Sequence, residues 1–290
     1  METLAIGIAI GCIYALVAVG YSLIYRTTGI VNFAQGAFVM IGGMAAYWLF
    51  GLLHLNYALA VVGGVLASAV VGLVLWYVVV WPLWRWRRRT FVVILATLVF
   101  ADLCQNAVSL LLGTSPQTLP AWFGSFKLTL GSGGVSGQYV VVIGISLLLM
   151  ALITGFLRWS SLGKALRACA ADRKTSQLLG IAPERIGALA MALTAAAAGL
   201  AGVVFTSAQY TSYSDGFSYG VFGFVAAVLG GFGSPAGGIV GGLVLGLVES
   251  FTGRYISSTY EEVIAFAVLL VLIMLRPQGL LGNNWEGAEQ

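Results

Sequence analysis

The chain has 290 residues, of which 60% are hydrophobic and 8% are charged, and its net charge is +4. Average soluble domains have about 25% charged residues, so this composition excludes a soluble globular protein and indicates a polytopic membrane protein. The three cysteines form no CxxC pair, which gives no support for a zinc site or a disulfide framework. The sequence contains no phosphate-binding loop and no HExxH motif, so we expect neither a metal site nor a catalytic site in this chain.

Continuous apolar segments determine the predicted fold. Most are about 16 to 25 residues long, which suits membrane-spanning helices and not the short alternating strands of a β-barrel. We predict an all-α transmembrane bundle of about eight to ten spans, forming a single domain over residues 1–290. The predicted spans cover residues 4–25, 30–52, 57–84, 91–112, 138–158, 185–207, 217–232, 237–253 and 260–275. The spans at 217–232 and 237–253 are short enough that re-entrant or broken helices are an alternative.

Basic residues predict the topology, because short cytoplasmic loops of membrane proteins are enriched in Lys and Arg. With nine spans and the N-terminus outside, all fourteen basic residues except Lys127 and Arg254 fall on the cytoplasmic side. The C-terminus is then also cytoplasmic. Residues 113–137 form an external loop, in which we expect a small strand pair around Phe126 to Leu130.

Polar side chains inside the predicted spans are candidates for a solute pathway, since such groups are costly in a bilayer. Asp102 lies near the middle of its span, and Gln105 and Asn106 follow it at helical spacing on one face. Asn32 and Gln35 open the second span, where an unwound first turn would place them beside a pathway. The alternative is that these groups, together with Glu249, only satisfy one another in helix packing.

Glycines are densest between residues 226 and 250, where several are spaced four residues apart. This spacing lets helices approach closely, so it predicts tight helix crossings, with a turn at Gly233-Ser234-Pro235. The segment lacks the Lys-Ser/Thr ending of a phosphate-binding loop.

The polar stretch from Arg158 to Arg185 contains too many basic residues to lie in hydrocarbon, yet its leucines recur at helical spacing. It predicts one or two short amphipathic helices over about residues 159–184, with Asp172 as an N-cap, Gly180 at the C-terminal end and Pro183 in the first turn of the next helix. Such helices would bind a partner through apolar and basic side chains, or would contact anionic headgroups. The candidate contact residues are Leu162, Lys164, Leu166, Arg167, Asp172, Arg173, Lys174, Leu178, Leu179 and Gly180.

Four motifs in this order carry a family resemblance. They are TTGIVNFAQGAFVMIGG, GKALRACAADRKTSQLLGI, AAVLGGFGSPAGGIVGGLVLGLVE and RPQGLLG. With them the chain resembles the permease family of bacterial branched-chain amino acid ABC importers, and its short N-terminus is more similar to the smaller, H-type permease than to the longer M-type. The resemblance spans residues 4 to about 282.

The resemblance implies a set of partners in the bacterial inner membrane. These are a second permease subunit, two cytoplasmic ATPases that bind the segment matching Gly163 to Ile181, a periplasmic substrate-binding protein and membrane lipid, with no nucleic acid. It implies no cofactor in this chain, since ATP and Mg would bind the partner ATPases. Urea or a short amide is an alternative solute within the same family. A proton-coupled secondary transporter centred on Asp102 and a membrane scaffold without transport are alternatives from other classes.

Overall fold

The computed structural model describes residues 2–86, 90–121, 127–130 and 133–281. Within these residues, helices occupy every predicted span position, and the predicted all-α bundle is confirmed. Seven of these helices are long and apolar enough to cross a membrane. The bounds are α1 Glu2–Thr28, α2 Gln35–Gly51, α3 Tyr57–Leu75, α5 Thr90–Leu112, α6 Gly137–Trp159, α9 Pro183–Thr206, α10 Asp215–Gly230, α11 Pro235–Tyr255 and α12 Glu261–Leu275.

Three of the nine helices named above are shorter than the others. Helix α2 has 17 residues, α10 has 16 and α12 has 15, which at about 1.5 Å per residue is less than the roughly 30 Å of a bilayer core. In contrast, α11 has 21 residues and is a full-length helix, so only one of the two predicted short spans is short. A π-helical segment, η1 (Trp76–Val80), joins α3 to α4 (Trp81–Arg85) in one 29-residue span, and a 3-10 turn, η2 (Ser258–Tyr260), precedes α12.

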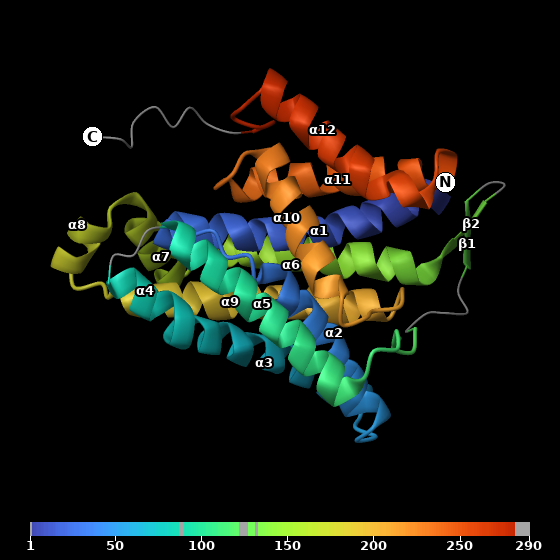
Figure 1. Ribbon diagram of the computed structural model, residues 1–290, viewed down its shortest axis with the longest axis horizontal. Helices are drawn as coiled ribbons and strands as arrows, with labels where there is room; N and C mark the ends of the chain where they lie inside the picture. The colour runs from blue at the N-terminus through green and yellow to red at the C-terminus, as the bar shows by residue number, and fades with distance from the viewer. Residues whose placement is uncertain (1, 87–89, 122–126, 131–132, 282–290) are drawn as a thin grey trace.

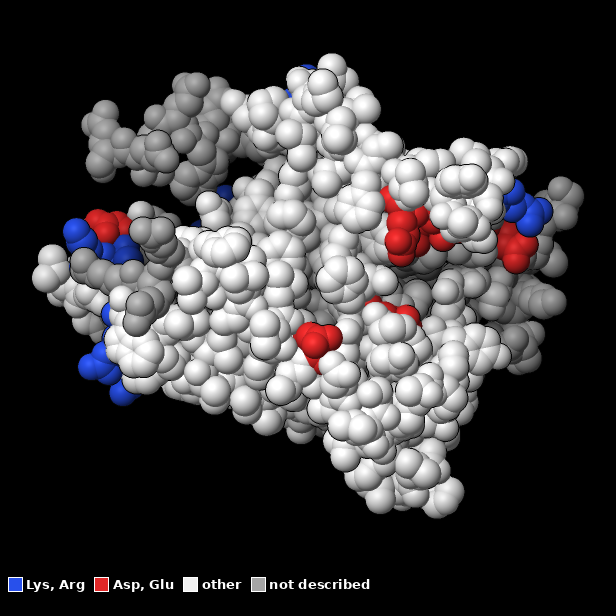
Figure 2. All heavy atoms as spheres, viewed as in Figure 1, with Lys and Arg blue, Asp and Glu red and all other residues white. Residues whose placement is uncertain are grey.

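The two ends of the bundle differ in charge. Helix α4 and two short helices, α7 (Ser161–Ala171) and α8 (Arg173–Leu178), lie at one end, and the start of α1 lies at the other (Figure 1). Figure 2 shows that Lys and Arg side chains gather over the end with α4, α7 and α8. Residues 87–89 are three further arginines that the sequence assigns to the same side of the membrane, and they lie outside the described residues. Assignment of this basic end to the cytoplasm stays a prediction.

A β-hairpin lies at the opposite end, beside the start of α1 (Figure 1). Strands β1 (Lys127–Leu130) and β2 (Gly133–Ser136) pair antiparallel, with Lys127 opposite Ser136. The small strand pair predicted for this loop is therefore confirmed, while Phe126 lies outside the described residues.

Helices α1 and α9 form the centre of the bundle. In their most apolar stretches 67% and 72% of residues are buried, against 17% in α5 and 6% in α12. Leucine, valine and phenylalanine side chains cover the outward faces of the peripheral helices. Such faces suit contact with lipid or with the helices of another subunit.

The glycines of α10 and α11 produce the predicted tight crossings, which are confirmed. A Cβ atom on Gly242 would collide with the backbone of Ala15 in α1, and one on Gly241 would collide with the Ala226 carbonyl in α10. The predicted turn is also present: Gly231 has φ 108° and Gly233 has φ 87°, a region that residues with a side chain rarely adopt.

The chain after α12 closes the end of α10. The N–H groups of Leu280 and Leu281 donate to the carbonyls of Leu229 and Gly230, each at 2.9 Å. Carbonyls in the last turn of a helix have no intrahelical partner, so this pairing satisfies two of them. The described part of the RPQGLLG motif thus fixes the C-terminal end of α10.

Candidate functional site

Helix α2 begins inside the bundle because the chain between Gly29 and Ala34 is not helical. Asn32 and Gln35 are both fully buried. The Asn32 Nδ2 lies 3.4 Å from the Met191 sulfur, and the Gln35 Nε2 donates to the Thr194 carbonyl at 3.2 Å, so both amides hold the start of α2 against α9. The predicted unwound turn is present, but neither side chain is open to solvent in this conformation.

One side-chain oxygen at the start of α2 has no hydrogen-bond partner among the described residues. The Gln35 Oε1 is buried and accepts no hydrogen bond among the described residues. Leaving a buried acceptor unsatisfied costs roughly 1 to 3 kcal/mol. A rearrangement at the start of α2 that exposed this oxygen to water or solute would recover that free energy.

Asp102 and Gln105 line a hollow of about 310 Å³ on the outer side of α5. Its other walls are mostly apolar and come from α5, from α10 and from the unwound segment before α2. They include Phe33, Leu98, Val99, Phe217 and Val221. Ligand pockets in proteins measure about 300 to 1,000 Å³ and have mainly apolar walls with a few polar groups, so the hollow has the size and lining for a small amphiphilic solute.

Hydrogen bonds fix two sides of this hollow. Gln105 Nε2 donates to the Ser214 carbonyl at 3.3 Å, which links α5 to the start of α10. The backbone N–H of Phe33 donates to the Thr97 hydroxyl at 3.2 Å, which links the unwound segment to α5. Gly36 allows close contact at this place, because a Cβ atom there would collide with the backbone of Gly216 and Gly220.

The remaining predicted pathway residue, Asn106, and the span residue Glu249 lie elsewhere. Asn106 is exposed and its amide donates to the Asp102 carbonyl at 2.9 Å, a bond within its own helix. Glu249 lies on α11 in a separate pocket near the η2 end of the bundle, together with Tyr14 and Glu261. The structure thus brings Asp102 and Gln105 together, and it separates them from Asn32 and Gln35.

Side-chain caps define the two helices of the polar stretch. The Ser160 hydroxyl accepts from the Gly163 N–H at 2.8 Å, and Asp172 Oδ1 accepts from the N–H groups of Lys174 and Thr175. These caps confirm the break at Ala171-Asp172 and the predicted N-cap role of Asp172. Hydrogen bonds from the Thr175 side chain and backbone, with a further one from Lys174, lower the pKa of the Asp172 carboxyl. Gly180, at φ 81°, ends the segment as predicted.

The leucines of this stretch point in two directions. Leu162, Leu178 and Leu179 are exposed, with 88% of Leu178 accessible. Leu166 is only 1% exposed, because it packs with Cys169 of α7 against Ile186 of α9. The prediction that Leu166 is available to a partner is therefore wrong: it belongs to the core of its own chain.

The basic residues divide in a similar way. Lys164 and Lys174 are exposed on the outer side of α7 and α8. The Arg173 guanidinium carbon lies 3.3 Å from the centroid of the Trp84 ring, which ties α8 to α4. Arg167 donates to the Arg158 carbonyl at 3.2 Å, which turns it toward the end of α6. Of the predicted basic contacts, the two lysines are exposed on the surface that the described residues form.

Several residues that shape these sites were not predicted from the sequence. Phe33, Phe217 and Val221 reach the Asp102 hollow from segments far away in the chain. No local spacing relates them to Asp102, because their proximity depends on how α2, α5 and α10 pack. Only the Gly216 and Gly220 pair, four residues apart, indicates a close helix crossing there.

Comparison with known proteins identifies the family of this chain. Residues 3–273 match the family described as branched-chain amino acid transport system / permease component. This chain belongs to that family. The permease is 33% identical to the high-affinity branched-chain amino acid transport system permease protein LivH of Escherichia coli K12, over 96% of this chain and 94% of LivH. It is 32% identical to the corresponding protein BraD of Pseudomonas aeruginosa, over 98% of this chain and 96% of BraD.

Two more distant similarities complete the comparison. The permease is 27% identical to the permease protein LivM of E. coli K12, over 93% of this chain and 68% of LivM. Its fold is similar to PsaBC from Streptococcus pneumoniae in complex with Fab, with a TM-score of 0.52 over 96% of this chain and 93% of that chain. At 14% identity this second similarity shows a shared fold alone.

Proposed function

We propose that this permease is a subunit of an ATP-driven importer for branched-chain or other small apolar amino acids. It forms the translocation pathway with a second permease, receives solute from a periplasmic binding protein and binds two separate ATPases that hold ATP and Mg. The names of LivH, BraD and LivM support the substrate class, and the similarity to both LivH and LivM supports pairing with a sister permease.

The observation that carries the coupling to ATPases is the exposed leucine surface on α7 and α8. Leu162, Leu178 and Leu179 project from two short capped helices at the basic end of the bundle. Exposed leucines on helices outside the membrane are costly in water, and a partner groove would bury them. A proton-coupled secondary transporter gives no reason for such a surface, so the importer is favoured.

The coupling is tested by the double variant Leu178→Asp/Leu179→Asp, expressed with the two ATPases, the sister permease and the binding protein. Both side chains are exposed, so we expect normal insertion and loss of most ATPase co-purification. Gln177→Asp is the control for added negative charge, since it places a carboxylate at an exposed position of α8 without removing a leucine. Full retention of the ATPases by the double variant would contradict the coupling role.

The Asp102 hollow is our candidate for this subunit's share of the pathway. Asp102 lies near the middle of α5, and its carboxylate would pair with the ammonium group of an amino acid while the apolar walls contact the side chain. The hollow lies on an outward face of the bundle, where a second permease would close it. Urea is neutral and has no apolar side chain, so this lining favours an aliphatic amino acid.

We expect Asp102→Asn to lower leucine uptake by about tenfold or more, because the ammonium group of the amino acid would lose a charged hydrogen-bond partner, which contributes about 1.5 to 3 kcal/mol. The measurement is leucine uptake into vesicles of the complete importer, with subunit stoichiometry measured in parallel. Asn106→Asp, one turn further along α5 and outside the hollow, controls for charge on this helix. Unchanged uptake by Asp102→Asn, in a complex that assembles normally, would mean that Asp102 contributes to helix packing and not to the pathway.

A further inference from the structure

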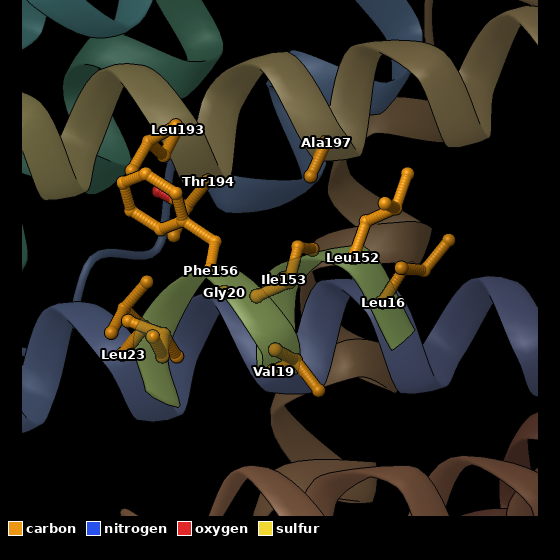
Figure 3. A pocket seen from close by; sticks show the side chains of 11 residues that line it. Leu16, Val19, Gly20, Leu23, Leu152, Ile153, Phe156, Leu193, Thr194 and Ala197 are labelled. Atoms are coloured by element: carbon orange, nitrogen blue, oxygen red, sulfur yellow. The ribbon is translucent and has the colours of Figure 1, made fainter. Parts of the chain in front are cut away.

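Two hollows meet at the basic end of the bundle. The first, which we call the apolar slot, lies between α1, α6 and α9 and measures about 200 Å³. Figure 3 shows its walls, with Leu16, Val19 and Leu23 from α1, Leu152 and Ile153 from α6, and Leu193 from α9. The slot borders the outer surface of the bundle, because Leu152 is 58% exposed.

The second hollow, which we call the arginine groove, measures about 510 Å³ and lies where α1, α6 and α7 come together. It is lined by Arg26 at the end of α1, Arg158 at the end of α6 and Arg167 on α7. Leu23 and Leu157 line both hollows, so the arginine groove continues into the apolar slot. None of the described residues that line either hollow is acidic.

Among the described residues that line the arginine groove, no acidic side chain balances the positive charge of the three arginines. Three arginines line one groove. The Arg167 guanidinium donates to the backbone carbonyl of Arg158 at 3.2 Å, which places it beside the end of α6. Like charges repel, so an anion in the groove would stabilise the arrangement. Guanidinium groups match the oxygens of a phosphate, with which they form paired charge-assisted hydrogen bonds.

We infer that the arginine groove and the apolar slot together form a binding site for an anionic phospholipid. The phosphate lies among Arg26, Arg158 and Arg167, and one acyl chain enters the slot past Leu23 and Leu157. The site sits at the membrane-facing edge of the basic end, where lipid reaches it from the bilayer. Basic pockets between transmembrane helices are known to bind such headgroups.

The proposed lipid site lies where α7 meets the transmembrane helices, so bound lipid would affect how α7 is attached to the bundle. Leu166, Arg167 and Ala170 of α7 line the groove, as does Pro235 at the start of α11. A bound lipid would therefore connect α7 to α1, α6 and α11. If the proposed coupling role of α7 holds, anionic lipid would stiffen the connection between the ATPases and the bundle. Lipid binding itself does not depend on that role.

The test is lipid binding to the purified full-length chain, measured by native mass spectrometry during titration with palmitoyl-oleoyl phosphatidylglycerol. Phosphatidylcholine with the same acyl chains is the neutral comparison, and glycerol 3-phosphate supplies the phosphate without acyl chains. We expect phosphatidylglycerol to bind roughly 100-fold more tightly than phosphatidylcholine, at about fivefold for each of the three arginines. Glycerol 3-phosphate should not displace it.

Single variants locate the site. Arg167→Gln should weaken phosphatidylglycerol binding about fivefold. Lys164→Gln removes a cation from the same helix but outside the groove, and it should change binding by less than about twofold. Arg26→Gln, on α1, replaces Arg167→Gln if that variant melts early, and it should weaken binding to the same extent. Leu152→Trp should also weaken binding, because it fills the slot from its outer wall.

Two results would overturn the proposal. Equal loss of binding in Arg167→Gln and Lys164→Gln would mean that diffuse positive charge attracts the lipid. Displacement of the lipid by glycerol 3-phosphate would mean a phosphate site that does not use the apolar slot. Neither result bears on the ATPase co-purification test, so failure of the lipid site and failure of the proposed function are distinguishable.

Discussion

Two regions of this permease use opposite means to fix their helices. In α10 and α11, glycines remove side chains so that backbones touch, as where Gly242 meets Ala15. In α7 and α8, side chains fix the helices instead, through the caps of Ser160 and Asp172 and the buried Leu166. The difference shows that the first region buries its contacts between helices of this chain, while the second leaves Leu162, Leu178 and Leu179 exposed.

The largest expected effect is in the glycine region. Gly242→Leu places four carbon atoms against the backbone of α1, so we expect a loss of about 3 kcal/mol of stability, or failure to accumulate. Gly144→Leu is the matched control, since nothing lies within 4 Å of a Cβ atom at that exposed position of α6. The measurement is thermal unfolding in detergent. A melting temperature for Gly242→Leu equal to that of the control would show that α1 and α11 separate easily.

The next effect separates the buried and the exposed leucines of the α7–α8 region. Leu166→Asp buries an unpaired charge against Ile186, and we expect a loss of about 4 kcal/mol. Leu179→Asp, at an exposed position nearby, should leave the melting temperature within about 2 °C of the parent protein. Similar melting temperatures for the two variants would contradict the inward position of Leu166.

The smallest effect concerns the Asp172 cap. Its carboxyl pKa is lowered in the folded protein, so its stabilisation of α8 is present above the ordinary carboxyl pKa of about 3.9 and is lost as the pH falls through the lower folded value. We expect the α8 amides to lose protection relative to their intrinsic exchange rates below about pH 4, with little change in the protection of α11. In Asp172→Asn, which keeps an acceptor oxygen, that acid-dependent change should be absent. An identical pH dependence in the variant would assign the effect to another group.

Local chemistry made much of this structure predictable. The α7–α8 break, the turn at Gly233-Ser234-Pro235 and the strand pair after residue 126 each depend on residues close together in the chain, and all three were confirmed. The candidate site was less predictable. Asp102 and Gln105 were found together because they share one helix face, but Asn32 and Gln35 turned out to be buried against α9.

The sequence by itself determined the membrane class, the positions of the helices and the motifs of the permease family, because apolar length, charge and cap residues act locally. Tertiary structure alone decided which leucine of the α7–α8 region is buried, which groups share the Asp102 hollow, and that Arg26, Arg158 and Arg167 line one groove. An amphipathic pattern shows that a helix has an apolar face, but it does not say which molecule covers that face. That depends on contacts between segments far apart in the chain.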